Sequence, residues 1–478
     1  MKNIRYILII LGLISAGIVI GQNSEFQPGD TLHLTLEECR ARALETNELL
    51  KIADETISQA EYQKKAAVSA YLPNVKASAI GMYSEQSYDE TLYLPTQVYD
   101  SSTGELVPNV LVDPTTGTPV IGTDGYPVFN SYAYLPLDIS SRGGFTAGLS
   151  LEQALYAGGK IAAGNTMAEI GISMANNNKV LKESESIYEC DQMFYLYVST
   201  IEKVKMAHQY KTLLDSLYQM VEDNYELGMI NRNEVLKVKV QLNDVILQVQ
   251  KAESGLQLAR MSLCRVIGLP YNTPITVNDS VDNYMLDMSA INDLDVTSRV
   301  EYQLLSRQVE MAEENVKMVQ GDYKPTAGVS LGYNYYNIDM QNADNIDNSG
   351  VSLMARLEIP ITTFGERKGK VNAEKTTVSI RQLELKRNSE LMQLEMEQAR
   401  LNLVDAHLRV ELAQEALEQA SENVRISQDG YELGMETIVD LLGAQASWQE
   451  AYSNKIDAET GFKLATSQFL KVTNSLQF

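Results

Sequence analysis

Two acidic residues occupy matching places in this chain of 478 residues and could do chemistry together. Glu234 and Asp440 lie 206 residues apart, and each follows a Tyr-Glu-Leu-Gly-Met motif, which begins at Tyr225 and again at Tyr431. Carboxylates that crowd around one opening raise one another's pKa and bind cations, as charged rings in pores do. Several copies of the chain, gathered at these motifs, would form an acidic aperture that the two acids and the two tyrosines gate.

Helix capping is the alternative role for both acids. Asn231 and Thr437 stand three residues before Glu234 and Asp440, and both arrangements resemble a capping box, although its usual first residue is Ser or Thr. An acid in the first turn of a helix also offsets the helix dipole. Capping and gating are compatible, so both roles stay open at this point.

No other pattern indicates catalysis, a cofactor or a metal. The histidines are isolated, and neither His-Glu-x-x-His nor Gly-x-Ser-x-Gly occurs in the sequence. The cysteines are few, odd in number and far apart, which fits neither a disulfide framework nor a zinc site and predicts small apolar core residues. The sequence therefore predicts a protein that is not an enzyme. The three histidines are His33, His208 and His407, and the three cysteines are Cys39, Cys190 and Cys264.

The N-terminus and the charge indicate where the protein works. Lys2 and Arg5 precede an apolar run at 6–20, and a run of about 15 residues is shorter than the ~20 that a spanning helix needs. Residues 1–21 are therefore predicted to be an export signal peptide. The net charge of −24 argues against binding of nucleic acid or anionic lipid through a basic patch.

The repeated motif belongs to a duplicated unit. The same offset of 206 residues pairs Gly144 with Gly350 and Val266 with Val472, which is one ungapped register over more than 120 residues. Each copy is predicted to contain two strands and a very long helical hairpin. The glycine of the motif lies at the tip of each hairpin, because glycine is the usual left-handed terminator of a helix.

Proline and polar stretches mark the boundaries between the parts. Residues 31–70 predict one helix, and the first copy holds 46 additional residues between its strands. The predicted layout is a signal peptide at 1–21, a periplasmic leading segment with the first helix at 22–70, the first strand pair at 71–156 with a long extracellular loop at 84–143, the first helical hairpin at 157–270 with its tip at 228, a periplasmic joint at 271–299, a helix at 300–322, the second strand pair at 323–362, and the second hairpin at 363–478 with its tip at 434.

The predicted helices carry an apolar seam of their own. From Val238 to Val266, and again from Leu441 to Val472, apolar residues recur at alternating spacings of three and four, which is typical of a coiled coil. The stretch at 161–227 would be ~100 Å long at 1.5 Å per residue. A helix of that length must pack beside others of its kind.

Four segments alternate between apolar and polar side chains. In 351–359 every odd position is apolar, 145–152 and 329–335 repeat the pattern, and 75–83 follows it more weakly. Runs of about nine to eleven residues suit a tilted strand that crosses a bilayer. A soluble sheet with one buried face alternates in the same way. Because the helices use their seam for one another, lipid is the apolar phase that remains for the sheet.

A sheet that spans lipid must close into a barrel. Four strands cannot close alone, a dimer gives eight strands around a filled interior, and a trimer gives twelve with room for a pore. The expected fold is mostly α with membrane β: a homotrimer with a 12-stranded membrane β-barrel and an α-helical barrel formed by the hairpins. The polar positions of the strands would line the pore, namely Lys76, Ser150, Glu152, Ser330, Asn334, Ser352, Arg356 and Glu358.

These features resemble the outer membrane efflux protein family of TolC-like channels. Tyr71-Leu72-Pro73 and Tyr323-Lys324-Pro325 are similar to the aromatic-x-Pro sequence that opens each strand pair in the family. Tyr-x-x-Gly followed by an acid and two aliphatic residues, as at 234–236 and 440–442, is similar to the family's tips. The resemblance covers essentially all of the mature chain. Gly443, where some members have a second aspartate, and the long loop at 84–143 depart from the common pattern.

The resemblance implies a trimeric duct in the outer membrane with a long periplasmic extension. It implies that the tips meet a periplasmic adaptor (membrane fusion) protein, which connects the duct to an inner-membrane transporter in a tripartite efflux or type I secretion system. Asp440 is the position that matches the family's acidic aperture ring. The tip residues expected to touch the adaptor are Leu227, Gly228, Met229, Leu433, Gly434 and Met435. A periplasmic coiled-coil scaffold without a channel is the alternative.

Overall fold

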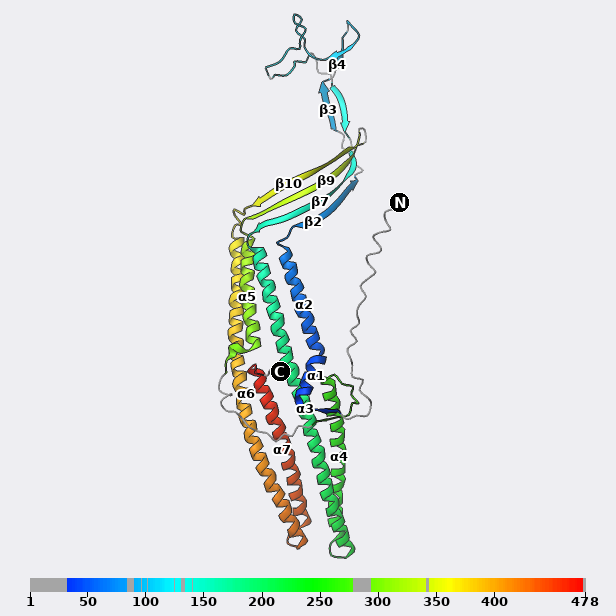
Figure 1. Cartoon of the computed structure of the whole chain (residues 1–478), viewed down its shortest axis with the longest axis vertical. Helices are drawn as coiled ribbons and strands as arrows, with labels where there is room; N and C mark the ends of the chain where they lie inside the picture. Colours follow the sequence, from blue (N-terminus) through cyan, green and yellow to red (C-terminus); the bar gives the residue numbers. More distant parts are fainter. Residues whose placement is uncertain are drawn as a thin grey trace, which may run out of the picture. The chain divides into compact units, whose positions relative to one another are not determined.

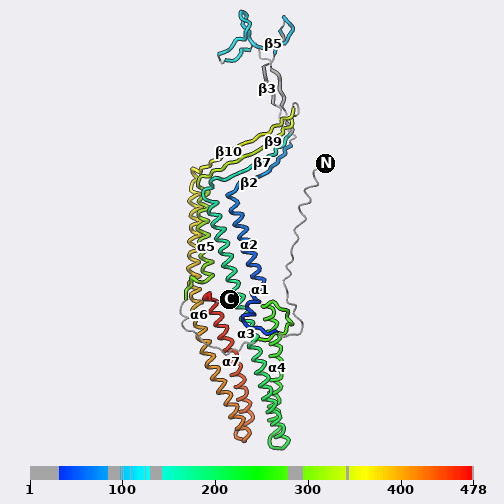
Figure 2. Tube along the Cα trace, in the orientation of Figure 1, coloured from blue at the N-terminus to red at the C-terminus, as the bar shows by residue number. Residues whose placement is uncertain are grey.

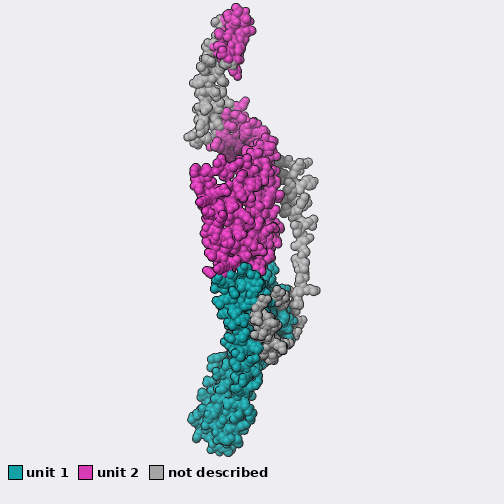
Figure 3. All heavy atoms as spheres, turned by 90° about the vertical axis from the view of Figure 1, so that its left-hand side faces the viewer, with its two compact units in different colours: residues 1–54, 178–302, 388–478 teal, residues 55–177, 303–387 magenta. Residues whose placement is uncertain are grey.

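The computed structural model describes residues 32–83, 90–95, 97–100, 102–123, 125–129, 134–139, 141–277, 294–340 and 344–475. The predicted signal peptide and parts of the predicted loop at 84–143 and joint at 271–299 lie outside these ranges. The chain divides into two compact units (Figure 3). Unit 1 consists of Met1–Asp54, Asn178–Tyr302 and Asn388–Phe478, and unit 2 consists of Glu55–Asn177 and Gln303–Arg387.

Unit 2 contains a four-stranded antiparallel sheet in the order β10-β9-β7-β2 (Figure 1). In its register Lys76 lies opposite Ser150, and Ser150 and Ser352 both lie opposite Gly332. The even-numbered positions of all four strands therefore share one face of the sheet. A β-bulge interrupts the pairing of β7 with β9 between Ala154 and Tyr156. The strands are β2 (Asn74–Tyr83), β7 (Ser141–Ala157), β9 (Thr326–Met340) and β10 (Ile346–Glu358).

Large apolar side chains on the opposite face of this sheet are exposed. Val351, Leu353 and Leu357 of β10 have exposed fractions of 73%, 79% and 68%, and every described residue of β2 and β10 is exposed. Within the described ranges, the outer edges of β2 and β10 pair with no other strand. A soluble sheet would bury one of its faces, so the soluble-sheet alternative does not fit these strands.

Short strands occupy part of the segment that was predicted as a loop. β3 (Glu90–Pro95) pairs with β6 (Tyr134–Ile139), and β4 (Gln97–Tyr99) pairs with β5 (Leu106–Pro108), both antiparallel. The insertion in the first copy is thus a β-structured segment.

Tight joints connect the strands of unit 2 to its helices. β7 passes into α3 (Lys160–Glu226) through Gly158, whose φ of +65° is left-handed, and a Cβ at Gly158 would lie 2.3 Å from the carbonyl oxygen of Gly321. Gly321 ends α5 (Val300–Gly321), and Lys160 and Asp322 form an ion pair at 2.9 Å beside it. The glycine is needed here because two chain segments meet backbone to backbone.

Unit 1 contains two helical hairpins (Figures 1 and 2). α3 is followed by α4 (Arg232–Val266), and α6 (Glu366–Glu432) is followed by α7 (Ile438–Val472). The predicted seam is confirmed by burial: Val238 and Leu263 of α4 are fully buried, and Phe462 of α7 is 4% exposed. The hairpins also join each other, because Gln449 of α7 donates a hydrogen bond to Gln248 of α4 at 2.7 Å. None of the described helices has the length and apolar character needed to cross a bilayer.

The prediction of a single helix at 31–70 is wrong. β1 (Leu32–Leu34) pairs in parallel with β8 (Ile275–Val277), and two helices follow, α1 (Leu36–Thr46) and α2 (Glu48–Ser69). Asn47 separates the two helices because its side chain accepts a hydrogen bond from the Leu49 amide and donates one to Ser186, both at 2.8 Å. Thr35 and Glu38 form a reciprocal capping box at the start of α1. A short 3-10 helix, η1 (Val296–Ser298), precedes α5.

The three cysteines lie in one core cluster of unit 1. Cys39, Cys190 and Cys264 are fully buried where α1 packs against α3 and α4. Burial raises the pKa of Cys39 to about 12 and raises the pKa of Cys190 further, so both are neutral thiols. Their predicted role as small apolar core residues fits this environment.

Candidate functional site at the helix tips and the polar strand face

The two hairpin tips have the same backbone geometry. Gly228 and Gly434 have φ values of +76° and +73°, as expected of glycines that terminate a helix. The amide that follows each glycine donates a hydrogen bond back into the helix, from Met229 to the Asn224 carbonyl at 2.9 Å and from Met435 to the Gly430 carbonyl at 2.8 Å. Both turns are Schellman motifs, so the repeated sequence produces a repeated fold.

Apolar side chains project from both turns into solvent. Leu227 and Met229 have exposed fractions of 70% and 72%, and Leu433 and Met435 have 72% and 73%. Four exposed apolar side chains in two equivalent turns are more than a monomeric surface usually leaves uncovered. The predicted adaptor contacts therefore lie on accessible surface.

The caps of the two ascending helices differ. The Thr437 hydroxyl donates to a carboxylate oxygen of Asp440 at 2.6 Å and accepts from the Asp440 amide at 3.3 Å, and the Thr437 amide donates to the same carboxylate at 3.0 Å. Asn231 makes no side-chain cap within the described residues, so the expected capping box at Glu234 is wrong.

The two tips also differ in the surroundings of their acidic residues and tyrosines. The hydrogen bonds from Thr437 lower the pKa of Asp440, so this exposed carboxylate is ionised at neutral pH. Burial, followed by the nearby charge of Glu234, raises the pKa of the Tyr431 hydroxyl. Tyr431 packs against the apolar cluster that contains Ile438, whereas Tyr225 in the first tip is 41% exposed. The structure thus brings Tyr431 and Glu234 together and leaves Tyr225 in solvent.

Two residues at the second tip, Gly430 and Glu436, were not identified as site residues from the sequence. The side chain of Glu436 lies over Gly430, where an added Cβ would be 3.0 Å from the Glu436 Cγ. One carboxylate oxygen of Glu436 and the Tyr431 hydroxyl are buried without a hydrogen-bond partner among the residues that the structure describes. The first copy has Asn224 and Ile230 at the equivalent positions. This difference between two otherwise matching tips was the sequence signal that could have identified both residues.

The asymmetry of the caps gives a first prediction. Thr437→Ala should weaken the start of α7 by about 1 kcal/mol, while Asn231→Ala should change the start of α4 by a few tenths of that, because only Thr437 makes side-chain cap bonds. Amide hydrogen exchange in the first turns of α7 and α4 measures both effects. The folded pKa of Asp440 is lowered, so the cap is complete at neutral pH and is lost only as the pH falls through that lowered value. Equal exchange rates in the two variants would contradict the assignment.

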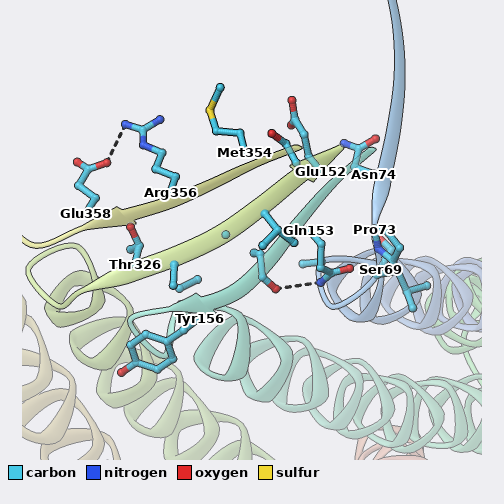
Figure 4. A pocket seen from close by; sticks show the side chains of 18 residues that line it. Ser69, Pro73, Asn74, Glu152, Gln153, Tyr156, Thr326, Met354, Arg356 and Glu358 are labelled. Carbon is cyan, nitrogen blue, oxygen red and sulfur yellow. Dashed lines mark hydrogen bonds and ion pairs between the residues drawn. The ribbon is translucent and has the colours of Figure 1, made fainter. Parts of the chain in front are cut away.

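The polar strand residues form the second part of the site. The register places all eight predicted pore residues on the even-numbered face of the sheet. Two ion pairs lie there, Lys76 with Glu152 at 2.6 Å and Arg356 with Glu358 at 2.8 Å. A hollow of about 990 Å³ includes Asn74, Glu152, Thr326, Met354, Arg356 and Glu358 in its lining (Figure 4). The charges of this face are therefore largely compensated within one chain.

Comparison with known proteins agrees with this architecture. Residues 305–474 match the family model described as Outer membrane efflux protein. The Outer membrane protein TolC of Vibrio cholerae is 20% identical over 341 residues, which is 69% of this chain and 77% of that protein.

Solved structures share the fold at low sequence identity. The outer membrane protein VceC of Vibrio cholerae has a TM-score of 0.70 and 13% identity, covering 92% of this chain and 95% of that one. The Campylobacter jejuni CmeC outer membrane channel has a TM-score of 0.68 and 16% identity, and the match covers 92% of this chain and 85% of that one. The Neisseria gonorrhoeae MtrE outer membrane channel has a TM-score of 0.70 and 13% identity, and the match covers 92% of this chain and 89% of that one. Together with the repeated strand pairs, hairpins and tips, these matches show that the chain is similar to the outer membrane efflux proteins, whose family model matches residues 305–474.

Proposed function

We propose that this protein is a trimeric export channel of the outer membrane, which passively conducts substrate delivered by an inner-membrane transporter through a periplasmic adaptor. The observation that carries the proposal is the sheet of unit 2, which has an apolar face, a polar face and two open edges. The match of residues 305–474 to the family model of outer membrane efflux proteins supports a location in the outer membrane and a role in export.

Closure of the sheet requires other copies of the chain. An open edge presents a row of unpaired N–H and C=O groups, which lipid cannot satisfy. β2 of one protomer can pair with β10 of the next, and three such pairings join twelve strands, enough to leave an open lumen. The odd-numbered apolar face then meets lipid, and the even-numbered face with Lys76, Glu152 and Arg356 lines the pore.

The tips supply the gate of the proposed channel. Three copies of Asp440 and three of Glu234 would place six carboxylates around one periplasmic opening, where they attract cations and repel one another. The second tip is the easier one to release, because Tyr431 and Glu436 hold buried polar atoms that gain hydrogen bonds when water reaches them. The exposed Leu433 and Met435, with their counterparts in the first tip, are where an adaptor would dock.

Single-channel conductance in a planar bilayer tests the gate. Asp440→Ala combined with Glu234→Ala should weaken block by a divalent cation about tenfold or more, because the ring loses six charges in the trimer. Asp244→Ala combined with Asp405→Ala is the matched control, because it also removes six carboxylates from the trimer, at exposed helix positions away from the tip turns. Unchanged conductance together with unchanged divalent block would remove the aperture from the proposal.

Assembly tests the channel against the scaffold alternative. A channel should be recovered from the outer-membrane fraction as a trimer that separates into monomers on heating in detergent. A water-soluble elongated particle would instead identify a periplasmic coiled-coil scaffold.

A further inference from the structure

The insertion in the first copy contains a short internal repeat that the channel role does not use. Asp-x-x-Thr-Gly occurs at 100–104 and again at 113–117, thirteen residues later. In each turn the aspartate accepts a hydrogen bond from the amide two residues on at 2.8 Å, to Asp100 from Ser102 and to Asp113 from Thr115. Gly104 and Gly117 have φ values of +69° and +66°. The repeat builds two equivalent, tightly bonded hairpin turns.

Apolar side chains beside these turns are exposed. Leu106, Val112 and Ile121 have exposed fractions of 54%, 45% and 57%, and all three lie within the span 97–129. Exposed aliphatic side chains on a structured, polar-rimmed segment mark a surface that a partner covers.

Charge decides which kind of partner fits. The sequence has no Lys or Arg from 77 to 141, whereas it has eight acids there: Glu85, Asp89, Glu90, Asp100, Glu105, Asp113, Asp124 and Asp138. Copies of this insertion would repel one another in a trimer, and anionic lipid headgroups would be repelled as well. A partner that covers the apolar side chains must therefore carry positive charge.

We infer that the hairpins at 97–129 form a docking surface for a basic, amphipathic polypeptide segment of another protein. Leu106 and Ile121 supply the apolar contact, and Asp100, Glu105 and Asp113 supply the complementary charge. The carboxylates of Asp100 and Asp113 are fixed by their own turns, and these hydrogen bonds lower the pKa of both groups, so the negative charge persists well below neutral pH. That this surface faces the cell exterior rests on the proposed function, but the docking itself does not.

Three synthetic peptides test the surface on the purified full-length protein in detergent. They alternate Lys with Leu, Glu with Leu, and Lys with Ser, and each carries a fluorophore for anisotropy at low and high salt. The Lys/Leu peptide should bind at least about tenfold more tightly than either other peptide, and more weakly at high salt, because the surface needs both charge and apolar contact. Equal affinity for the Lys/Leu and Glu/Leu peptides would overturn the proposal.

Variants locate the binding. Leu106→Ser with Ile121→Ser should weaken Lys/Leu binding about tenfold. Asp100→Asn with Asp113→Asn keeps an oxygen acceptor for each turn, so the hairpins stay folded, and it should weaken binding severalfold. Asp244→Asn with Asp405→Asn removes the same charge from exposed helix positions and should have no effect. Unchanged binding in both insertion variants would overturn the proposal. All variants should retain conductance, so a failure of docking is distinguishable from a failure of the channel.

Discussion

Leu353→Arg is expected to reduce the amount of trimer in the outer membrane about 30-fold or more, whereas Ser352→Arg should leave it nearly unchanged. Leu353 lies on the odd-numbered face and is 79% exposed, and Ser352 lies on the even-numbered face opposite Gly332. An arginine on the lipid face near the bilayer midplane costs about 2–4 kcal/mol, while a lumen position keeps its charge in water. Quantitative blotting of heat-modifiable trimers from membrane fractions measures both variants.

The two substitutions are matched because they introduce the same side chain at neighbouring positions of one strand. Any general effect of arginine on expression or export is therefore shared, and the difference between the variants reports which face meets lipid. If Ser352→Arg blocked assembly and Leu353→Arg did not, the assignment of faces and of the eight pore residues would be reversed. Equal assembly of both variants would argue that the sheet does not span lipid.

Asp191→Ala is expected to destabilise the packing of α1 by about 3–5 kcal/mol, which is the second large effect. Arg40 donates two hydrogen bonds of 2.7 Å to the carboxylate of Asp191, whose side chain is fully buried. Removing the carboxylate leaves the largely buried guanidinium without its counter-charge. The guanidinium cannot escape the cost by losing its proton, because an arginine side chain stays protonated in proteins.

Amide hydrogen exchange of α1 in the intact protein measures this loss as a fall in protection of about 100-fold or more. The double variant Arg40→Met with Asp191→Leu is the control, because replacing both partners of a buried pair with apolar residues is often nearly neutral. If Asp191→Ala left exchange in α1 unchanged, the pair would not hold α1 in place. If the double variant were as unprotected as Asp191→Ala, general packing rather than an unpaired charge would be responsible.

Patterns with a local period allowed much of the fold to be predicted from the chain alone. Side chains of a strand alternate between faces and those of a helix recur every three or four residues, so the parity of Ser352 and Leu353 and the burial of Val238 follow from spacing. The offset of 206 residues likewise indicated two equivalent tips, and both glycines have the expected left-handed backbone. The predicted acids also lie in the first turns of α4 and α7, as their positions after the motif required.

Contacts between residues that are far apart in the sequence decided the features that local patterns did not predict. Asn47 separates the two halves of the predicted first helix with a local hydrogen bond from Leu49 and a hydrogen bond to Ser186, and no local pattern shows the second, because Ser186 is 139 residues away. The two capping boxes looked alike in sequence, but in the folded chain only Thr437 makes side-chain cap bonds. Tyr431 differs from Tyr225 because residues of α7 and the charge of Glu234 surround it in the folded chain. Periodicity thus determined which way each side chain faces, and the tertiary structure alone decided what each one meets there, because partners in space are set by packing between elements.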